Sequence, residues 1–476
     1  MTLFSVLLIA IIFFQLRKQK TLSDYFIKIT AMAVSLEMMM AIGYFLRIGA
    51  VEIGYSEFII ILDTILCILL LSKKKIRKSA FILGLLFILS CFISLLLQFI
   101  FPYDGKVVSS SAAWDFYYFQ GQLPDNISIG LQNIKELLHV FCYVIIIIQA
   151  NSLSDEKKKL MIKNVFENSK YFIWFGIIEF VLIKILHVQT ILTSIELFIF
   201  GDSYISDGAM LSIGVSDRLR GLKPEPSMYG FSLFLFFSLS YFLYKQTNIK
   251  RYKKYSIITI LLMVLSLSFT SLVCLFGIFV YWLVLKYKEG KRKNKHAIVL
   301  LACICILALI LFLKYMYLHE FSQYYLKRIH MALINFDDLS INGWHGDYAT
   351  YDGSTKIRLI SIIGTLKYFI KRPLFGLALG STYAHSTFAT VLASIGLVGV
   401  ILWWKFTFEG NGEKKGNIFV LSTIIWCALL LIMGSGLFPF YGVENIVVVY
   451  IFDNFASTRK KRNEYESQNI NYNSLL

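Results

Sequence analysis

Charged residues are scarce in this sequence. Only 16% of the 476 residues are Asp, Glu, Lys or Arg, whereas 57% are hydrophobic. Soluble domains carry a larger charged fraction, so the composition excludes an ordinary soluble protein. Many segments reach the roughly 20 apolar residues that a helix needs to cross a bilayer. The sequence therefore predicts an integral membrane protein.

Several common kinds of site are also missing. All seven cysteines lie in apolar segments, where we expect small buried side chains and neither disulfides nor metal ligands. There is no Walker loop, Rossmann glycine fingerprint or serine nucleophile elbow. His345 and Asp347 are two metal-ligand types close together, but no cysteine or second histidine supports them. We expect neither a metal ion nor a cofactor.

The positions of the cations argue against a nucleic-acid partner. The net charge is +17, but most Lys and Arg residues lie in short connections between apolar segments, which is the positive-inside pattern. The apolar segments run approximately over residues 2–16, 24–46, 57–72, 79–101, 131–150, 171–188, 226–244, 256–269, 271–287, 297–314, 386–404, 418–436 and 439–453. They predict an all-α polytopic membrane protein of about 13 transmembrane helices, with residues 1–476 forming one integral membrane domain.

Two decisions fix the topology. The first segment lacks the basic region and cleavage site of a signal peptide, so we interpret it as a retained span with the N-terminus outside. Residues 256–287 are too long for one ordinary span, and a cluster of Ser and Thr at 266–271 indicates a turn. A hairpin there keeps every lysine-rich connection cytoplasmic, whereas one tilted helix would move basic residues 291–293 outside. We therefore predict the hairpin and a cytoplasmic C-terminus.

Three long connections are then predicted outside: residues 102–130, 189–225 and 315–385. The first is rich in aromatic residues, which suits the membrane interface. The third contains Ser354–Arg372, where apolar residues recur near a helical period among five cations, and Pro373 follows. We expect an amphipathic helix there, lying on the outer leaflet and ending before the proline.

The most unusual chemistry lies in residues 217–230, where the second outer connection meets a span. Three cations and the acid Glu225 are combined with two prolines that stiffen the chain and two glycines that let it turn. These residues are Arg218, Arg220, Lys223, Glu225, Pro224, Pro226, Gly221 and Gly230. Two guanidiniums one residue apart suit recognition of phosphate or pyrophosphate. The alternative is a basic cluster that contacts lipid headgroups.

Acidic residues inside the spans and one histidine complete the candidates. For Glu37 and Asp63 we favour structural pairing over a proton path, and Lys184, five residues on, is the expected partner of Glu179. Among the external histidines, only His385 lies where a loop enters a span, which places it over the mouth of the bundle. The alternative is that His385 makes its hydrogen bonds at the membrane interface and has no catalytic role.

Three motifs, in this order, resemble the Wzy-type O-antigen and capsule polymerases and the related O-antigen ligases, which are bacterial membrane glycosyltransferases. The first is Arg218-x-Arg-Gly-x-x-x-Glu-Pro-Ser-x-x-Gly230. The second is Lys356-Ile-Arg358, in a surface helix that runs into Arg-Pro-Leu-Phe-Gly376. The third is His385, followed by a span with Gly396-Leu-Val-Gly399. The motifs cover about the C-terminal half of the chain, and the gap between Gly376 and His385 is shorter than the resemblance leads us to expect.

The resemblance implies a GT-C-like fold and a polysaccharide polymerase that acts at the outer face of the bacterial cytoplasmic (inner) membrane. It would transfer the growing glycan from undecaprenyl diphosphate to a sugar hydroxyl of the incoming lipid-linked oligosaccharide, with inversion and without a metal. Partners implied are the lipid bilayer, a flippase and a chain-length regulator.

The chemistry of the residues agrees with this implication. Fixed arginines can stabilise the charge that develops on a diphosphate leaving group, and a histidine can accept the proton of the sugar hydroxyl. The predicted catalytic residues are His385, Arg218 and Arg358, and the predicted substrate-binding residues are Arg220, Lys223, Glu225, Tyr229 and Lys356. Glu225 is the alternative base, although we prefer an orienting role because nearby cations keep it ionised.

Two other functions stay open. A ligase would move finished glycan to another acceptor, and the local motifs barely separate it from a polymerase. A transporter, such as a flippase for lipid-linked sugars, should show internal repeats, broken mid-membrane helices and midplane charges. The sequence has no internal repeat and its unusual chemistry lies in outer loops, so we favour the polymerase.

Overall fold

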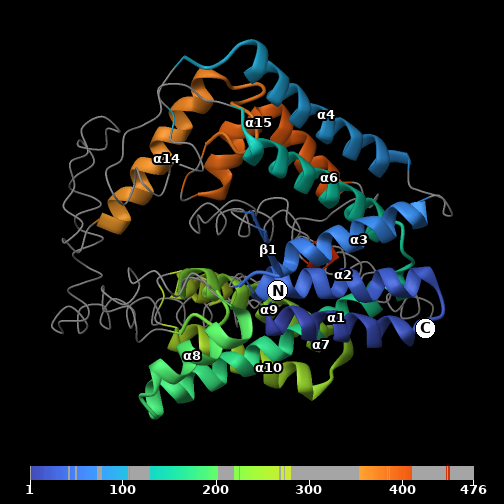
Figure 1. Ribbon diagram of the computed structural model, residues 1–476, viewed down its shortest axis with the longest axis vertical. Helices are drawn as coiled ribbons and strands as arrows, with labels where there is room; N and C mark the ends of the chain where they lie inside the picture. The colour runs from blue at the N-terminus through green and yellow to red at the C-terminus, as the bar shows by residue number, and fades with distance from the viewer. Residues whose placement is uncertain are drawn as a thin grey trace, which may run out of the picture.

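The computed structural model describes residues 2–40, 43–48, 51–71, 78–104, 107, 129–201, 219–223, 226–266, 268, 270–272, 274–279, 353–382, 384, 386–409, 446–447 and 449–450. Most of these residues are helical (Figure 1). The helices are α1 (Leu3–Arg17), α2 (Leu22–Met39), α3 (Tyr55–Leu71), α4 (Lys78–Ile100), α6 (Leu131–Asn151), α7 (Asp155–Phe180), η1 (Val181–Ile185), α8 (Gln189–Phe200), α9 (Pro226–Thr247), α10 (Lys250–Leu265), α14 (Gly353–Lys371), α15 (Thr387–Trp404) and η3 (Lys405–Glu409).

Four of the described helical runs are long and apolar enough to cross a membrane. They are Lys78–Ile100, Leu131–Asn151, Pro226–Thr247 and Ala389–Thr407. Shorter apolar helices cover Leu3–Gln15, Thr190–Phe200 and Thr270–Phe279. This part of the chain agrees with the predicted all-α membrane protein. The number of 13 spans extends over residues outside the described part and stays a prediction.

The predicted span over residues 24–46 is too long. Thr21 caps the start of α2 by accepting a hydrogen bond from the Asp24 N–H, and the helix ends at Met39. Gly43 then adopts a left-handed conformation, with φ 78°, and the chain enters the antiparallel hairpin of β1 (Leu46–Ile48) and β2 (Val51–Ile53). Leu46, the last residue of the predicted span, lies in β1, and the Phe45 N–H donates to Ile53 O at 2.8 Å.

The helices form two groups in Figure 1. The upper group consists of α4, α6, α14 and α15, and the lower group contains α1, α2, α7, α8, α9 and α10. Between them lies α3, which packs on both α2 and α6. The core is formed by the buried apolar faces along these contacts.

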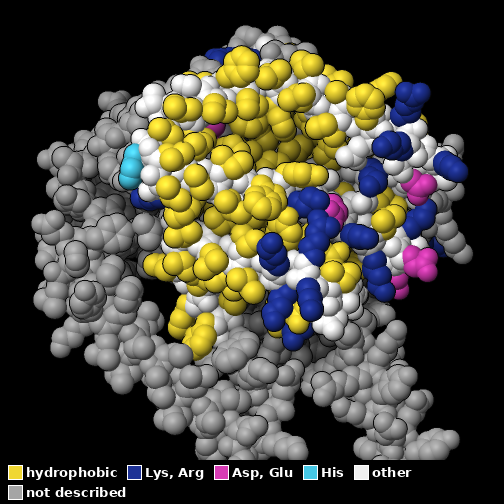
Figure 2. Space-filling view, turned by 90° about the horizontal axis from the view of Figure 1, so that it is seen from below, with side chains coloured by type: hydrophobic (Ala, Val, Ile, Leu, Met, Phe, Trp, Pro, Cys, Tyr) yellow, Lys and Arg dark blue, Asp and Glu magenta, His cyan; other side chains and the backbone are white. Residues whose placement is uncertain are grey.

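The connections between helices gather at two ends of the bundle, as the charge pattern predicts. At one end, Lys157 Nζ lies 2.9 Å from Ser23 Oγ, and Arg251 Nη2 lies 3.0 Å from Glu167 Oε2. Three predicted cytoplasmic connections thus meet there, and Figure 2 shows Lys and Arg side chains grouped beside a wide hydrophobic area. At the other end, the residues in contact are Thr2, Tyr44, Tyr55 and Phe200. All four lie in or beside predicted outer segments; which end faces outside stays a prediction.

A helix break lies within residues 256–287, at the turn of the predicted hairpin; that its two arms are separate spans stays a prediction. α10 ends at Leu265, and the next apolar helix begins at Thr270. The hydroxyls of Ser266 and Ser271 hydrogen-bond across the break at 2.7 Å. Two of the polar residues that indicate a turn therefore pair with each other.

A second break lies within α15. Gly396 has φ 65° and ψ −173° in the middle of the helix, and the segment Pro373–Leu377 lies against it. The Leu397 N–H donates to Pro373 O at 2.8 Å, and the Leu377 N–H donates to Ala393 O at 2.8 Å. The inserted segment therefore supplies hydrogen-bond partners at a break that membrane lipid would leave unpaired. Two predicted motifs, residues 372–376 and 396–399, are in contact as a result.

The helix predicted over Ser354–Arg372 is confirmed as α14, which ends at Lys371 shortly before Pro373. Arg372 then donates to Gln98 Oε1 (3.1 Å) and to Phe101 O (2.5 Å) at the end of α4. A cation is favourable at the carbonyl end of a helix, so Arg372 ties α14 to α4. The position of α14 on the outer leaflet stays a prediction.

Candidate functional site

Three predicted site residues, Arg220, Lys223 and Tyr229, surround one turn that precedes α9. The Lys223 N–H donates to Arg220 O at 3.1 Å and closes the turn. Gly221 has φ 57°, a conformation that favours glycine, and Leu222 forms a bridge with Met40. We call residues 219–223 the arginine turn.

A buried carboxylate fastens the arginine turn to α7. Glu179 Oε1 accepts from the Arg220 backbone N–H at 3.1 Å, and Oε2 accepts from the Gly221 N–H at 2.7 Å. The Glu179 side chain is fully buried, so these bonds replace the water that a carboxylate would otherwise bind. The structure corrects the expected pairing with Lys184, because the Glu179 carboxylate is turned toward the arginine turn.

A second buried carboxylate holds the side chain of Arg220. Glu196 on α8 is fully buried, and its Oε2 accepts from Arg220 Nη2 at 2.5 Å. The Arg220 side chain is 17% exposed, so part of it reaches the surface. A guanidinium has five N–H donors, and Glu196 is the one acceptor for them within the described residues. The other donors suit an anion that approaches from the surface.

Lys223 ties the arginine turn to α2. Its Nζ donates to the backbone carbonyl of Glu37 at 2.9 Å. This carbonyl lies in the last turn of α2, where backbone oxygens lack partners within the helix and the helix dipole is negative. The turn is therefore held by α2, α7 and α8 together.

Tyr229 lies beneath the turn, and only 1% of it is exposed. A Cβ atom on Gly221 would come within 2.5 Å of its ring, and one on Gly176 would come within 1.9 Å of its hydroxyl oxygen. Glycine at both positions therefore lets the ring fit between α7 and the turn. The substrate contact predicted for Tyr229 would require this side chain to be uncovered.

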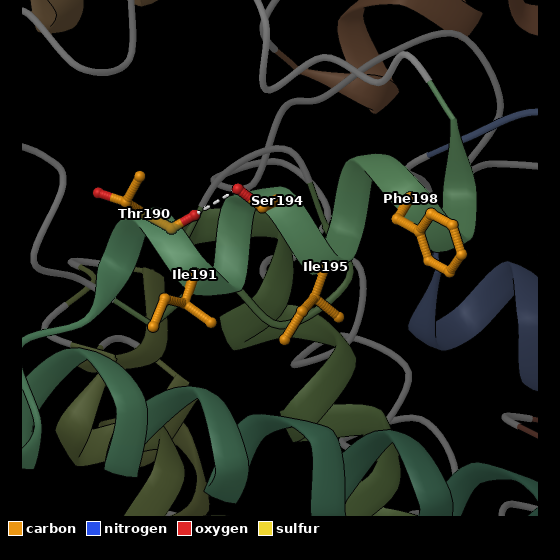
Figure 3. Close-up of a pocket in the computed structure, with 5 residues that line it drawn as sticks. All are labelled: Thr190, Ile191, Ser194, Ile195 and Phe198. Atoms are coloured by element: carbon orange, nitrogen blue, oxygen red, sulfur yellow. Dashed lines mark hydrogen bonds between the residues drawn. The ribbon is translucent and has the colours of Figure 1, made fainter.

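An open pocket of about 310 Å³ lies along α8 (Figure 3). It is lined by Thr190, Ile191, Ser194, Ile195 and Phe198. Ile191 and Ile195 point to one side of the helix, and Ser194 on the other side donates to Thr190 O at 2.9 Å. The apolar side chains suit a hydrocarbon rather than a phosphate. None of the five residues that line the pocket is charged, so the pocket offers no acid, base or cation for catalysis.

The side chains of the other predicted site residues lie outside the described part of the structure. Arg218, Glu225 and His385 are outside it as whole residues, whereas the backbone of Lys356 and Arg358 lies in the N-terminal half of α14. α15 begins directly after Ser386, whose side chain accepts from the Ala389 N–H. Position 385 therefore comes just before a candidate span, as the sequence predicted.

Glu196 is not among the predicted site residues. Residues 189–225 are predicted to form an outer loop, but α8 forms a 12-residue apolar helix there. A single carboxylate in an apolar helix was the available signal, since such a group needs an internal partner. No group of three His, Cys, Asp or Glu side chains forms a candidate metal site in the described part of the chain.

The sequence matches no known protein-family model, and no curated protein or solved structure shows significant similarity to it.

Proposed function

We propose that the protein is an inverting, metal-independent glycosyltransferase that polymerises lipid-linked oligosaccharide repeat units. It transfers the growing glycan from undecaprenyl diphosphate to a sugar hydroxyl of the incoming unit, at the outer face of the bacterial cytoplasmic membrane. The observation that carries the proposal is the arginine turn, a guanidinium fixed by buried groups at the bundle end opposite the lysine-rich connections. The order of the three sequence motifs adds support.

The leaving group explains the need for fixed cations. The bond between the anomeric carbon and the diphosphate oxygen breaks, and its electron pair leaves with the diphosphate. Hydrogen-bond donors already in place stabilise the charge as it develops, because they need no rearrangement. Arg220 supplies such donors, and we assign Arg218, Arg358, Lys223 and Lys356 to the same diphosphate.

The acceptor needs a base. Its hydroxyl oxygen forms the new bond to the anomeric carbon and gives up a proton, which we assign to His385. A neutral imidazole accepts a proton near neutral pH, and position 385 lies two residues before the start of α15. Glu225, between two prolines and near cations, is assigned an orienting role.

The proposal is tested by an in vitro polymerisation assay. It combines the purified protein with lipid-linked repeat units extracted from a deletion strain. Wild-type protein should produce a ladder of longer lipid-linked glycans and release undecaprenyl diphosphate. Arg220→Ala should slow this reaction by about 10²-fold or more, and Arg220→Lys should restore little, because lysine lacks the planar fork. Lys163→Ala, at an exposed lysine of α7, should retain full activity.

The products separate the proposal from a ligase. A polymerase lengthens the lipid-linked glycan, whereas a ligase moves finished glycan to a different acceptor without lengthening it. Transfer without lengthening would replace the polymerase assignment, and no reaction by the wild-type protein would contradict both.

Two observations favour a transporter as a second candidate. α15 is broken at Gly396, and Asp63 is fully buried in α3, with Thr30 Oγ1 donating to its Oδ1 at 3.0 Å. Broken helices and intramembrane carboxylates are common in transporters. At this break, however, Ala393 O and Ser394 O already accept hydrogen bonds from protein groups. An assay with labelled lipid-linked sugar in sealed liposomes distinguishes the two functions. Movement of the labelled sugar across the bilayer without lengthening of the glycan would favour the transporter.

A further inference from the structure

We infer that Glu179 and Glu196 are positioning residues for diphosphate binding: Glu179 fixes the backbone of the arginine turn, and Glu196 fixes the guanidinium of Arg220. This inference rests on the proposed function and deepens it. Neither carboxylate touches the substrate, because both side chains are fully buried. They act through Arg220.

Glu179 holds the backbone of the arginine turn. Two successive N–H groups, of Arg220 and Gly221, point at the two oxygens of one carboxylate, at 3.1 and 2.7 Å. Successive backbone N–H groups at a turn with a left-handed residue form a concave anion site, or nest. Glu179 occupies this nest. A diphosphate at the arginine turn must therefore be bound by side chains, and their aim depends on Glu179.

Glu196 holds the side chain of Arg220. Glu196 takes a hydrogen bond from Nη2 of Arg220, which orients the plane of the guanidinium and leaves its other donors for a ligand. Lysine at this position has no such plane. The helix that carries Glu196, α8, packs on α1 and η1, so the anchor belongs to the bundle and does not move with a loop.

The charges around the arginine turn make the inference testable, because it predicts the opposite change in diphosphate affinity from net charge alone. Arg220 and Lys223 contribute two positive charges, and Glu179 and Glu196 contribute two negative ones. If net charge governed diphosphate binding, removal of either carboxylate would strengthen it. If the carboxylates position Arg220, their removal weakens binding although the protein becomes more positive.

The experiment measures binding of undecaprenyl diphosphate to purified full-length protein. Glu179→Gln should weaken binding about tenfold or more, because glutamine offers one acceptor and turns a donor toward the second N–H. Glu196→Gln should also weaken it, and serves as the second variant if Glu179→Gln does not fold. Arg220→Ala combined with Glu179→Gln should bind no more weakly than Arg220→Ala alone. Glu167→Gln, the same charge change at the opposite end of the bundle, is the matched control and should not alter binding.

Hydrogen exchange separates this inference from the proposed function. Glu179→Gln should speed exchange at the amides of Arg220 and Gly221 and leave α9 protected. Unchanged exchange there, or unchanged or tighter diphosphate binding by both variants, would overturn the inference. If exchange speeds up but wild-type protein binds no undecaprenyl diphosphate, the carboxylates still hold the turn and the proposed substrate is wrong.

Discussion

At the residue scale, the described arginines and lysines differ in the groups that accept their hydrogen bonds. Arg372 donates to the Phe101 carbonyl near the end of α4. Arg251 and Lys170 share the carboxylate of Glu167 at the lysine-rich end. Arg220 is different, because a single buried carboxylate holds it while part of its side chain reaches the surface. This combination is the reason why we propose Arg220 as a ligand-binding cation.

The first prediction concerns His385. His385→Ala should lower the rate of polymer formation by about 10²–10⁴-fold, which is the usual contribution of a general base. Lipid-linked single repeat units should accumulate, because donor binding does not need the imidazole. The measurement is the glycan ladder made by purified variants.

His330→Ala and His345→Ala are the matched controls, and both should keep near-normal activity. Near-normal polymer from His385→Ala would move the base to Glu225 or to no side chain.

The second prediction concerns the pH dependence of Glu167. Burial raises the pKa of this carboxyl, but hydrogen bonds and charges from Lys170 and Arg251 outweigh burial, so the pKa is lower than its usual 4.5. The stability that Glu167 contributes is therefore present above the unfolded pKa and is lost as pH falls through the lower folded pKa. Glu167→Gln should destabilise the protein by about 0.2–1 kcal/mol at neutral pH, as expected for a partly exposed pair.

Thermal unfolding midpoints of wild-type and Glu167→Gln protein should converge as the pH falls below the folded pKa. A gap that widens toward acid would show that the carboxylate is not stabilised by these two cations.

At this scale the sequence located the arginine turn but not the groups that hold it. Arg220 and Lys223 stand out because they lie in a patterned segment between spans. Their carboxylate partners are distant in sequence: Glu179 is 41 residues from Arg220 and Glu196 is 24. In the sequence, Lys184 is the nearby cation that offers itself as a partner for Glu179, five residues on.

At the element scale, helix bounds followed from apolar runs and breakers. The predicted bounds of α4, α6 and α9 agree with the structure to within a few residues, because nothing interrupts the apolar pattern. Prediction failed where apolar residues served another purpose. Residues 44–46 entered a hairpin, and residues 189–200 formed α8 within a predicted loop. Composition alone does not distinguish these uses.

The third prediction concerns the break in α15. Gly396→Ala should destabilise the protein, because φ 65° disfavours a side chain and the new Cβ would lie 2.4 Å from backbone atoms of Leu374. Backbone strain contributes about 1–3 kcal/mol, and overpacking typically adds about 1–3 kcal/mol. Thermal unfolding in detergent measures the loss.

Gly130→Ala is the control, since a Cβ there has nothing within 4 Å, and it should leave the midpoint nearly unchanged. Equal midpoints for both variants would contradict the close approach of residues 373–377 to α15.

At the scale of the whole molecule, the fourth prediction fixes the orientation. Cysteines introduced at Ser206 and Ser340, in the predicted outer connections, should react with a membrane-impermeant thiol reagent in intact cells. A cysteine at Ser154, in a predicted cytoplasmic connection, should react only after lysis. The native cysteines lie in apolar segments and should stay unlabelled.

The reverse pattern would invert the protein in the membrane and place the arginine turn inside the cell. The proposed reaction with lipid-linked units at the outer face would then be excluded.

The alternation of connections between two ends was predictable from the sequence, because Lys and Arg residues concentrate in every second connection. The meeting of residues 23, 157, 167 and 251 at one end agrees with that pattern. The grouping of helices into two sets joined by α3 was not predictable. It depends on which helix faces are complementary, and in a membrane protein nearly all faces are apolar.

The segment that fills the break in α15 also bears on the order in which the protein is made. Pro373–Leu377 precedes α15 in the chain, so it emerges from the ribosome before Gly396 does. Both halves of α15 can therefore find their backbone partners as soon as they emerge. If the segment followed α15, the half-helices would first meet lipid with unpaired N–H and C=O groups. This part of the bundle can close during synthesis, without waiting for the last residues of the chain.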